Sequence, residues 1–386
     1  MVTTFTVPAA IVTGIGALDT LPTHITRLAA TRVLIVTDAF FATNGLAARV
    51  EALLIAAGVA VAVFDEVQPD PSVHNVEDGL VALRQHDADC IVALGGGSPI
   101  DAAKAIAVRA TNAGALRGYL GGVPIPLPGV PLIAIPTTAG TGSEATNVAV
   151  ITDTVRDEKM MLKDRYLLPR VALVDPALSM SMPPALTAFV GVDTLTHGIE
   201  AYVSRRATPL TDPIALSCIA LVARHLETAY REPTNEEARE AMAIAACQGG
   251  IAFSNSSVAL VHGMSRPVGA VFHVPHGLSN AVLLPTVTRY SLSGASARYA
   301  IVARAMGYAA ADDPDAVAGE ALVAGLESLN ARLGVPRLRD CRGVDRSRFE
   351  AVVEKMAVDA LVSGSPANNP VVPDAAEIVR LYHAAW

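Results

Sequence analysis

The 386-residue sequence predicts an N-terminal doubly wound α/β domain with a parallel sheet, followed by an all-helical C-terminal domain. In the first part, short and nearly continuous apolar segments alternate with segments of helical spacing, which is the pattern of a parallel sheet covered on both faces. From about residue 181, long Ala-rich segments with a period of about 3.6 residues replace this alternation. At roughly 150 residues per domain the length fits two domains, and we expect them over residues 1–180 and 181–386.

The elements of the first domain follow one another along the chain. Aliphatic and β-branched runs predict strands at 33–38, 61–66, 89–94 and 131–138. Segments of helical spacing predict helices at 44–58, 73–86 and 99–110. Because crossovers between parallel strands are right-handed, such helices cover both faces of the sheet. The Pro/Gly-rich segment 118–131 is expected to be an ordered loop over the sheet.

The second domain is expected to contain only helices. Periodic segments predict long helices within 183–204, 211–232, 235–254 and 316–334. Asp212 and Asn235 stand where helix N-caps are expected. The four-residue spacing of Asp193 and His197 then places both side chains on one face of the first of these helices.

Composition excludes several classes of function. With 29 Lys+Arg against 37 Asp+Glu, the net charge is −8 and no basic block exists, which argues against nucleic-acid binding. No uninterrupted apolar run reaches the about 18 residues of a membrane span, and the N-terminus lacks the pattern of a secretion signal. The four cysteines form no CxxC pair, so we expect free thiols and a cytoplasmic protein rather than a cysteine-ligated zinc site.

A glycine-rich turn is the first candidate binding site. In LGGGSPIDAAK (94–104), Gly95, Gly96 and Gly97 follow a strand and open a helix. Glycines let backbone N–H groups approach an anion closely, and the helix N-terminus favours negative charge. We interpret this turn as a cradle for a diphosphate, although the usual GxGxxG fingerprint is absent. The alternative is an ordinary strand-to-helix turn.

Two further features point to a nucleotide. The segment PTTAGTGSEAT (136–146) also follows a strand and offers hydroxyl groups for phosphate, ribose or carboxamide, although a capped turn is as good an explanation when it is taken alone. Asp38 ends the first strong strand, where an acidic side chain can accept hydrogen bonds from ribose and would repel a 2′-phosphate. The alternative for Asp38 is a helix N-cap.

The helical half contains a candidate metal site. Asp193 and His197 share a helix face, and LVHGMSRPVGAVFHVPHGLSN adds His262 and His276. One carboxylate and three imidazoles suit Fe(II), Zn(II), Co(II) or Ni(II). A lone histidine on an apolar helix is usually structural, but three of the nine histidines, His262, His273 and His276, fall within 15 residues.

Taken together, GGGSPIDAAK, PTTAGTGSEAT, DTLTHGIEAYVS and HGMSRPVGAVFHVPHGLSNAVLLP resemble the iron-containing (group III) alcohol dehydrogenase family, in the family's order and over essentially the whole chain. The resemblance implies a dehydroquinate synthase-like fold, in which a Rossmann-like α/β domain precedes an all-α domain. It implies metal ligation by Asp193, His197, His262 and His276. It implies a cofactor site formed by Asp38, Gly96, Gly97, Ser98, Thr137, Thr138, Thr141 and Thr146, with Lys159 a weaker match.

The resemblance also implies an activity. The expected enzyme is an NAD-dependent alcohol dehydrogenase or aldehyde reductase for a small alcohol, diol, hydroxy acid or semialdehyde. NADP is the less expected cofactor because of Asp38, and Fe(II) is the expected metal, with Zn(II) or another divalent ion as the alternative. A homo-oligomer, specifically a dimer, is expected, with no nucleic-acid or membrane partner.

Two positions depart from the family's pattern. Many members carry a histidine four residues after the first HG-motif ligand, where this chain has Arg266. Arginine cannot relay protons near neutral pH, so His273 becomes the candidate relay, or else a residue that orients a ligand. Arg266 suggests a substrate with a carboxylate or another anion, the alternative being an ion pair with a local acid or the cofactor. The second departure is Asp70, where the family commonly has asparagine.

We also considered four other functions for these motifs. A hydroxyacid-oxoacid transhydrogenase would share every motif and would differ in retaining its nicotinamide. A maleylacetate reductase-like enzyme works without metal, which the intact Asp/His set argues against. A dehydroquinate synthase-like lyase needs several Lys/Arg for a phosphorylated sugar acid, whereas only Lys355 follows Lys163. A non-catalytic metal-binding protein would leave the nucleotide loops without a role.

Overall fold

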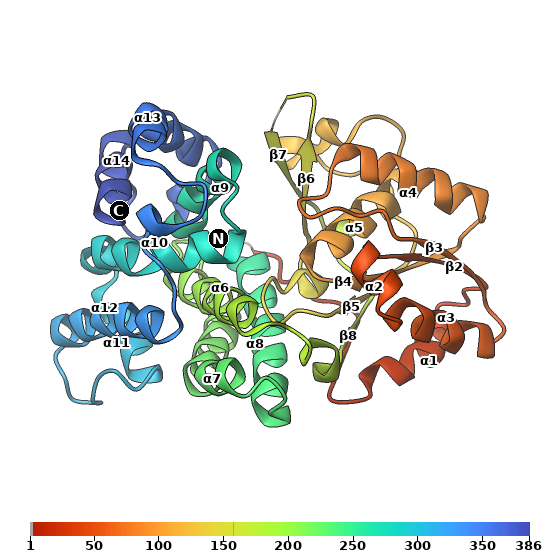
Figure 1. Cartoon of the computed structure of the whole chain (residues 1–386), viewed down its shortest axis with the longest axis horizontal. Helices are drawn as coiled ribbons and strands as arrows, with labels where there is room; N and C mark the ends of the chain where they lie inside the picture. Colours follow the sequence, from red (N-terminus) through yellow and green to blue (C-terminus); the bar gives the residue numbers. More distant parts are fainter. Residues whose placement is uncertain (1–2, 157) are drawn as a thin grey trace. The chain divides into compact units, whose positions relative to one another are not determined.

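Six parallel strands form the centre of the N-terminal unit in this computed structural model (Figure 1). The structure describes residues 3–156 and 158–386. The chain separates into two compact units, one of Thr6–Met180 and one built mainly of Ser181–Trp386. The strand order in the sheet is β1 (Ala10–Thr13), β8 (Val171–Val174), β5 (Leu132–Pro136), β4 (Cys90–Gly95), β2 (Arg32–Val36) and β3 (Ala60–Phe64). The expected parallel sheet is confirmed, and β1 and β8 are strands that the sequence patterns did not predict.

Both faces of the sheet are buried, as the nearly continuous apolar strands require. Val33 and Ile35 of β2 belong to one core cluster, while Leu34 and Val36 belong to the other. Helices α1 (Leu21–Arg27) and α3 (Leu46–Ala56) pack into the first cluster, and helices α4 (Val73–Gln85) and α5 (Gly97–Thr111) pack into the second. Short α2 (Ala39–Thr43) follows β2. The doubly wound arrangement is therefore confirmed.

A two-stranded hairpin was not predicted by the sequence patterns. β6 (Val148–Asp153) and β7 (Glu158–Lys163) pair antiparallel and contribute Ala149, Ile151, Met160 and Leu162 to the core cluster that contains α4 and α5. The backbone N–H of Thr152 donates to the Pro71 carbonyl at 2.7 Å, which ties the hairpin to the turn before α4. In β7 only Met160, Met161 and Leu162 are apolar, and charged residues stand at both ends of the strand, so its apolar run is short.

The Pro/Gly-rich segment 118–131 is ordered. Its first residues belong to the 3₁₀ helix Leu116–Gly122, which contacts β7, and its last part lies on α5 rather than on the six-stranded sheet. The Leu127 N–H donates to Asn112 Oδ1 at 2.9 Å, and Asn112 Nδ2 donates back to the Leu127 carbonyl at 2.9 Å. The Val130 N–H donates to the Ala107 carbonyl at 3.1 Å. Asn112, the C-cap of α5, thus pins the loop to the helix end.

The second unit is helical throughout its described residues, as expected. Its helices are α6 (Pro184–Val203), α7 (Asp212–Arg231), α8 (Glu236–Ser256), α9 (Leu260–Phe272), α10 (His276–Ser291), α11 (Ser296–Ala305), α12 (Asp315–Arg332), α13 (Arg346–Val362) and α14 (Ala375–Ala384). Asn235 caps α8 by accepting from the Ala238 N–H, as predicted. The expected N-cap role of Asp212 is wrong, because Thr211 precedes α7 and the Asp212 carboxylate accepts from Arg298 at 2.6 Å.

Among the described residues, no single helix has both the length and the apolar composition of a membrane span. Helices α8 and α9 meet the same criteria only as a pair, bent by 105° at their junction.

The close packing of segment 118–131 on α5 gives a test of the fold. A Cβ at Gly129 would lie 2.7 Å from the backbone carbon of Ala107 and 2.8 Å from its oxygen, whereas a Cβ at Gly118 would meet nothing within 4 Å. We expect Gly129→Ala to lower the free energy of unfolding by about 1–3 kcal/mol. Gly118→Ala is the matched control and should change it by less than about 0.5 kcal/mol. Urea denaturation followed by circular dichroism measures both, and equal midpoints for the two variants would contradict the packing described.

Candidate metal and cofactor sites

Asp193 and His197 lie one turn apart on α6 and are both buried. The distance from His197 Nε2 to Asp193 Oδ1 is 3.8 Å. Glycines on α6 and α8 allow the close packing around this turn. A Cβ at Gly249 of α8 would lie 3.3 Å from His197 Cβ, and a Cβ at Gly198 would lie 2.9 Å from Ile219 Cγ1 of α7. The helical spacing predicted for this pair therefore gives a buried face that neighbouring helices enclose.

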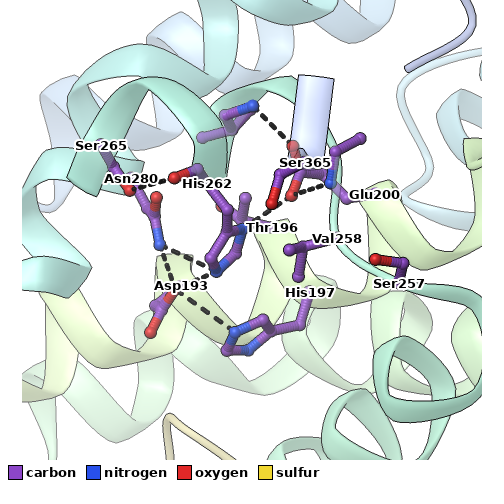
Figure 2. Close-up of polar contacts among 12 residues, drawn as sticks. Asp193, Thr196, His197, Glu200, Ser257, Val258, His262, Ser265, Asn280 and Ser365 are labelled. Carbon is purple, nitrogen blue, oxygen red and sulfur yellow. Dashed lines mark hydrogen bonds and ion pairs between the residues drawn. The ribbon is translucent and has the colours of Figure 1, made fainter. Parts of the chain in front are cut away.

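His262 and His276 come to the same point from α9 and from the first residue of α10. His262 Nε2 is 3.6 Å from Asp193 Oδ1. One ligand atom from each of Asp193, His262 and His276 can be chosen so that all three lie within 4.8 Å of one another. The rings of His197 and His262 stack with centroids 4.7 Å apart, and Figure 2 shows both rings directed toward Asp193. All four predicted ligand residues are thus brought together.

Desolvation disfavours the protonated forms of His262 and His276. Desolvation, together with the nearby His197, keeps the pKa of His262 well below its usual value, and Asp193 opposes this only in part. Desolvation likewise lowers the pKa of His276 to about 4, again against the influence of Asp193. A neutral imidazole offers a nitrogen lone pair to a metal, whereas an imidazolium cannot. The cluster is therefore set up electrostatically as a ligand set for a cation.

Glu200, one turn beyond His197 on α6, is a site residue that the sequence reasoning missed. Its buried carboxylate accepts from His262 Nδ1 at 2.6 Å and from the backbone N–H groups of Ala259 at 2.9 Å and Val261 at 2.6 Å. Desolvation raises the pKa of Glu200 to about 7, and the two backbone donors oppose that shift. With Nδ1 committed to Glu200, the Nε2 lone pair of His262 faces Asp193, an arrangement typical of metal-binding histidines.

Asn280 on α10 is a second missed residue. It is fully buried, and its Nδ2 donates to Asp193 Oδ1 at 2.6 Å, while His262 Nε2 and His276 Nε2 lie 3.1 and 3.2 Å away. Its Oδ1 is a buried oxygen for which the described residues supply no hydrogen-bond partner. The signal in the sequence was the four-residue spacing from His276, which places Asn280 on the same face of α10.

The donor set fits a divalent ion. One carboxylate and three imidazoles come together, with Asp193, His197 and His262 buried and His276 exposed. This set suits Fe(II) and Zn(II), and no thiolate is needed. All four cysteines, Cys90, Cys218, Cys247 and Cys341, are free and buried, and burial raises the pKa of Cys218 to about 12. The cysteines therefore offer no competing thiolate ligand.

The two residues singled out for catalysis lie in different settings on α9. Arg266 is one turn after His262, and its Nη1 donates to Ser365 Oγ at 2.8 Å. Desolvation lowers the pKa of Arg266, and the charge of Glu200 raises it. His273 is the C-cap of α9, is exposed, and has a left-handed backbone with φ of 56°. Arg266 therefore lies close to the ligand cluster, and His273 lies in the turn that leads to His276.

The glycine triplet forms a tight strand-to-helix turn in the N-terminal unit. β4 ends at Gly95, Gly96 is the N-cap of α5, and the helix begins at Gly97, with Ser98 in its first turn. Gly95 has φ of 146°, a conformation that side chains rarely allow. A Cβ at Gly97 would lie 3.0 Å from Thr141 Cγ2, and a Cβ at Gly96 would lie 3.4 Å from Thr138 Cγ2. The two predicted cofactor loops are therefore in contact.

The loop 136–146 contains a buried hydroxyl group that also indicates ligand binding. Thr137 is buried, and the described residues supply no hydrogen-bond partner for its Oγ1. Its backbone N–H donates to the Gly95 carbonyl at 3.0 Å, which holds the residue against the glycine turn. A buried hydroxyl without a protein partner beside a glycine-lined helix N-terminus fits a polar, anionic ligand such as a dinucleotide.

A buried lysine, which the sequence reasoning did not single out, connects the two loops. Lys104 on α5 is fully buried, and its Nζ donates to Ser143 Oγ at 2.8 Å, Thr146 Oγ1 at 2.9 Å and the Val148 carbonyl at 2.7 Å. Ser143 Oγ donates to Asp101 Oδ1 at 2.6 Å. Thr146, predicted as a cofactor residue, is thus a partner of Lys104.

Asp38 and Lys159 have protein partners of their own. Asp38 caps α2, because its Oδ1 accepts from the Phe40 N–H at 3.0 Å and the Phe41 N–H at 3.2 Å. One carboxylate oxygen of Asp38 therefore serves the helix, as the N-cap alternative predicted. Lys159 Nζ donates to Asp70 Oδ1 at 2.6 Å, and Asp70 has a left-handed backbone with φ of 58°. Asp70, the second position that departs from the family's pattern, is thus the ion-pair partner of Lys159, a predicted cofactor residue.

Comparison with known proteins identifies the family that combines an α/β unit with this glycine turn and a helical unit with this Asp/His cluster. Residues 8–176 match the family model of iron-containing alcohol dehydrogenases, and residues 187–386 match the model of the C-terminal part of that family. The chain belongs to the iron-containing alcohol dehydrogenase family.

Individual relatives are similar in sequence to this protein over nearly the whole chain. The NAD-dependent methanol dehydrogenase of Bacillus methanolicus is 39% identical over 98% of this chain and 99% of its own. The lactaldehyde reductase of Escherichia coli K12 is 38% identical over 97% of both chains. A crystal structure of 1,3-propanediol oxidoreductase superposes with a TM-score of 0.96 at 37% identity and covers 100% of both chains.

The hydrogen bond between Glu200 and His262 gives a test of the metal cluster. Glu200→Gln replaces an acceptor oxygen with an N–H₂ group that faces N–H donors, so we expect the affinity for Zn(II) to fall about 10–100-fold. Competition with a chelator at fixed pH measures this affinity. Glu240→Gln, which removes an exposed carboxylate of the same unit, is the matched control and should leave the affinity unchanged. Equal affinities for the two variants would remove Glu200 from the site.

Proposed function

We propose that this chain is an NAD-dependent and divalent-metal-dependent dehydrogenase or reductase that interconverts a small alcohol, diol, hydroxy acid or semialdehyde with its oxidised partner. The observation that carries the proposal is the convergence of the Asp193 carboxylate with the imidazoles of His197, His262 and His276 from α6, α9 and α10. The NAD-dependent methanol dehydrogenase and the lactaldehyde reductase among its relatives support the substrate class. The nucleotide function is assigned to residues 1–180, and the metal and substrate functions to residues 181–386.

Asp193, His197, His262 and His276 are the proposed metal ligands. Fe(II) is the proposed ion, with Zn(II) as the alternative, because both accept one carboxylate and three imidazoles. When bound, the ion polarises the substrate oxygen while the nicotinamide exchanges a hydride with the adjacent carbon. The protein contributes the imidazoles, and Glu200 fixes the orientation of His262. Burial of Asp193, His197 and His262 strengthens the electrostatic interactions among them.

The proposed NAD site is built from the glycine turn and the hydroxyl loop. Gly96, Gly97 and Ser98 provide the N-terminus of α5 for the diphosphate. Further contacts are assigned to the loop residues Thr137, Thr138, Thr141 and Thr146 and to Lys159. Asp38 is proposed to favour NAD over NADP, because its carboxylate would repel a 2′-phosphate.

His273 and Arg266 are proposed as the residues nearest the reaction on α9. His273 would relay a proton between the substrate oxygen and solvent, which its exposed position in the α9–α10 turn supports. Arg266 would bind the substrate rather than move a proton, because a guanidinium stays charged near neutral pH.

A cytoplasmic location and a homodimer complete the proposal. Four reduced, buried thiols and no disulfide among the described residues support a reducing compartment. Light scattering coupled to gel filtration gives the mass of the assembly.

The activity is tested by absorbance at 340 nm with NADH or NADPH and a panel of short aldehydes, after loading with Fe(II) or Zn(II). We expect His262→Ala to abolish turnover and metal retention while NADH binding persists, because the ligand belongs to the helical unit and the glycine turn to the other. His225→Ala removes a histidine of α7 outside the cluster and is the matched control. Full activity in His262→Ala would remove that residue from the ligand set.

The cofactor preference is tested by a variant that keeps the helix cap. Asp38→Ser retains a side-chain oxygen for the Phe40 and Phe41 N–H groups but removes the negative charge. We expect the ratio of kcat/KM for NADPH to that for NADH to rise at least about tenfold, which is about 1.4 kcal/mol. Asp78→Ser, at an exposed position on α4, is the control for the charge change alone. An unchanged ratio in Asp38→Ser would show that Asp38 serves only as a helix cap.

A further inference from the structure

Three charged side chains meet where α5 contacts the loop 136–146, and none of them belongs to the proposed metal site. Asp101 and Lys104 come from α5, and Glu144 comes from the short 3₁₀ helix Ser143–Ala145 within the loop. Lys104 is fully buried, and Glu144 is only 2% exposed. Burial of charge is unfavourable unless the groups are paired and hydrogen-bonded. The partners of these side chains therefore show which part of the fold they hold.

The ammonium group of Lys104 uses all three of its hydrogens in this region. Its Nζ donates to Ser143 Oγ at 2.8 Å, to Thr146 Oγ1 at 2.9 Å and to the Val148 carbonyl at 2.7 Å. Because an ammonium group has three donors and no acceptor, these three bonds saturate it. The bonds fix the end of the loop and the start of β6 against α5.

Asp101, one turn before Lys104 on α5, fixes the same segment. Ser143 Oγ donates to Asp101 Oδ1 at 2.6 Å, and the Val150 N–H donates to Asp101 Oδ2 at 2.9 Å. Asp101 Oδ1 is also 3.7 Å from Lys104 Nζ. The Ser143 hydroxyl accepts from one charged group and donates to the other, so its orientation is defined.

Ser143 is bonded in turn to the part of the loop that contacts the glycine turn. Its backbone N–H donates to Thr141 Oγ1 at 3.2 Å. A Cβ at Gly97 would lie 3.0 Å from Thr141 Cγ2 and 3.3 Å from Thr141 Oγ1, so this threonine contacts the first residue of α5. A series of direct contacts therefore connects Lys104, through Ser143 and Thr141, to the helix N-terminus at which the diphosphate is proposed to bind.

We propose that Lys104 is a positioning residue for the dinucleotide, which acts through Ser143 and Thr141 to hold the loop 136–146 in its binding shape. This inference rests on the proposed function. A loop that is already fixed loses less conformational freedom when the ligand binds, so its affinity for NADH is higher than that of the same loop without the ammonium group. The metal cluster belongs to the other unit, so its affinity for zinc does not depend on Lys104.

The charge of Lys104 gives the affinity for NADH a pH dependence. Desolvation lowers the pKa of Lys104 to about 8, and the charges of Asp101 and Glu144 oppose that shift. Deprotonation leaves an amine with two hydrogens for three acceptors. Because the protonated form binds NADH more tightly, we expect the dissociation constant of the zinc-loaded protein to increase above about pH 8, by at most about tenfold per pH unit. Fluorescence titration with NADH at a series of pH values measures it.

A second variant assigns this pH dependence to Lys104. Desolvation raises the pKa of Glu144 to about 7, and the charge of Lys104 opposes that shift, so Glu144 also titrates near the range of the measurement. Glu144→Gln removes this titration and a charge that stabilises the ammonium group. We expect it to keep the loss of affinity at high pH and to shift that loss to lower pH. Loss of the pH dependence in Glu144→Gln would show that Glu144, and not Lys104, causes it.

Lys104→Met removes the ammonium group and keeps most of the side-chain volume. We expect it to raise the dissociation constant of NADH about 10–100-fold, the loss typical of hydrogen bonds to a charged group, and to abolish the change above pH 8. The value of kcat at saturating NADH should change less than about threefold, and the zinc affinity should stay the same. Ile106→Ala is the matched control. Ile106 is also fully buried on α5, but it packs against Gly79 of α4, so the variant should lower stability and keep the NADH affinity.

Ser143→Ala tests the proposed series of contacts without removing a buried charge. We expect a smaller increase in the dissociation constant of NADH than in Lys104→Met. The double variant should bind NADH no more weakly than Lys104→Met, because both residues act in one hydrogen-bond network. Fully additive losses would show that Lys104 acts by another route.

Each outcome supports or overturns the inference. If wild-type protein binds NADH equally well on both sides of pH 8, or if Lys104→Met binds it as tightly as wild type, the inference is overturned and the proposed function stands. Equal losses of affinity in Lys104→Met and Ile106→Ala would make Lys104 a residue of general stability and would also overturn it. If Lys104→Met does not fold, the wild-type pH profile and Ser143→Ala decide. If wild-type protein binds no NADH, the proposed function fails, and the inference fails with it.

Discussion

The buried carboxylate of Glu200 is the interaction on which the metal cluster depends. It accepts from the backbone at the start of α9 and from His262 Nδ1, so it joins α6 to α9 at the level of the ligands. Without that acceptor, two backbone N–H groups would be buried without partners, and the ring of His262 would be free to turn. Because Asp193, His197 and Glu200 occupy successive turns of one helix, a single rigid element positions three of the polar groups of the site.

In the N-terminal unit, the buried positive charge of Lys104 has a role that corresponds to that of Glu200. Lys104 is fully buried and donates to Ser143, Thr146 and the Val148 carbonyl, so one ammonium group holds the hydroxyl loop against the helix that begins at the glycine turn. Desolvation lowers the pKa of Lys104 to about 8, and Asp101 and Glu144 oppose that shift. In each unit, a buried charged side chain fixes the backbone that carries the binding groups.

Much of this organisation could be predicted from residue patterns. The apolar strands of the sheet, the helical second half and the four-residue spacing of Asp193 and His197 are local features, and the structure has them as expected. Other features depend on contacts between distant segments. The hairpin β6–β7 is stabilised by packing against the core cluster of α4 and α5 rather than by its own pattern. The cap of α7 is Thr211 and not Asp212, because the carboxylate has Arg298 of a later helix as its partner.

The sequence by itself determined the kinds of elements, the residue types of the ligand set and the glycines at the turn, because these follow from periodicity and from the chemistry of single side chains. Only the tertiary structure decided which groups support them. Glu200, Asn280, Lys104 and Ser365 act across separations of 39 to 99 residues. No local pattern marks a buried acceptor whose donor lies on another helix. Such pairs form only in the folded protein, because packing removes both groups from water and each then needs the other as its hydrogen-bond partner.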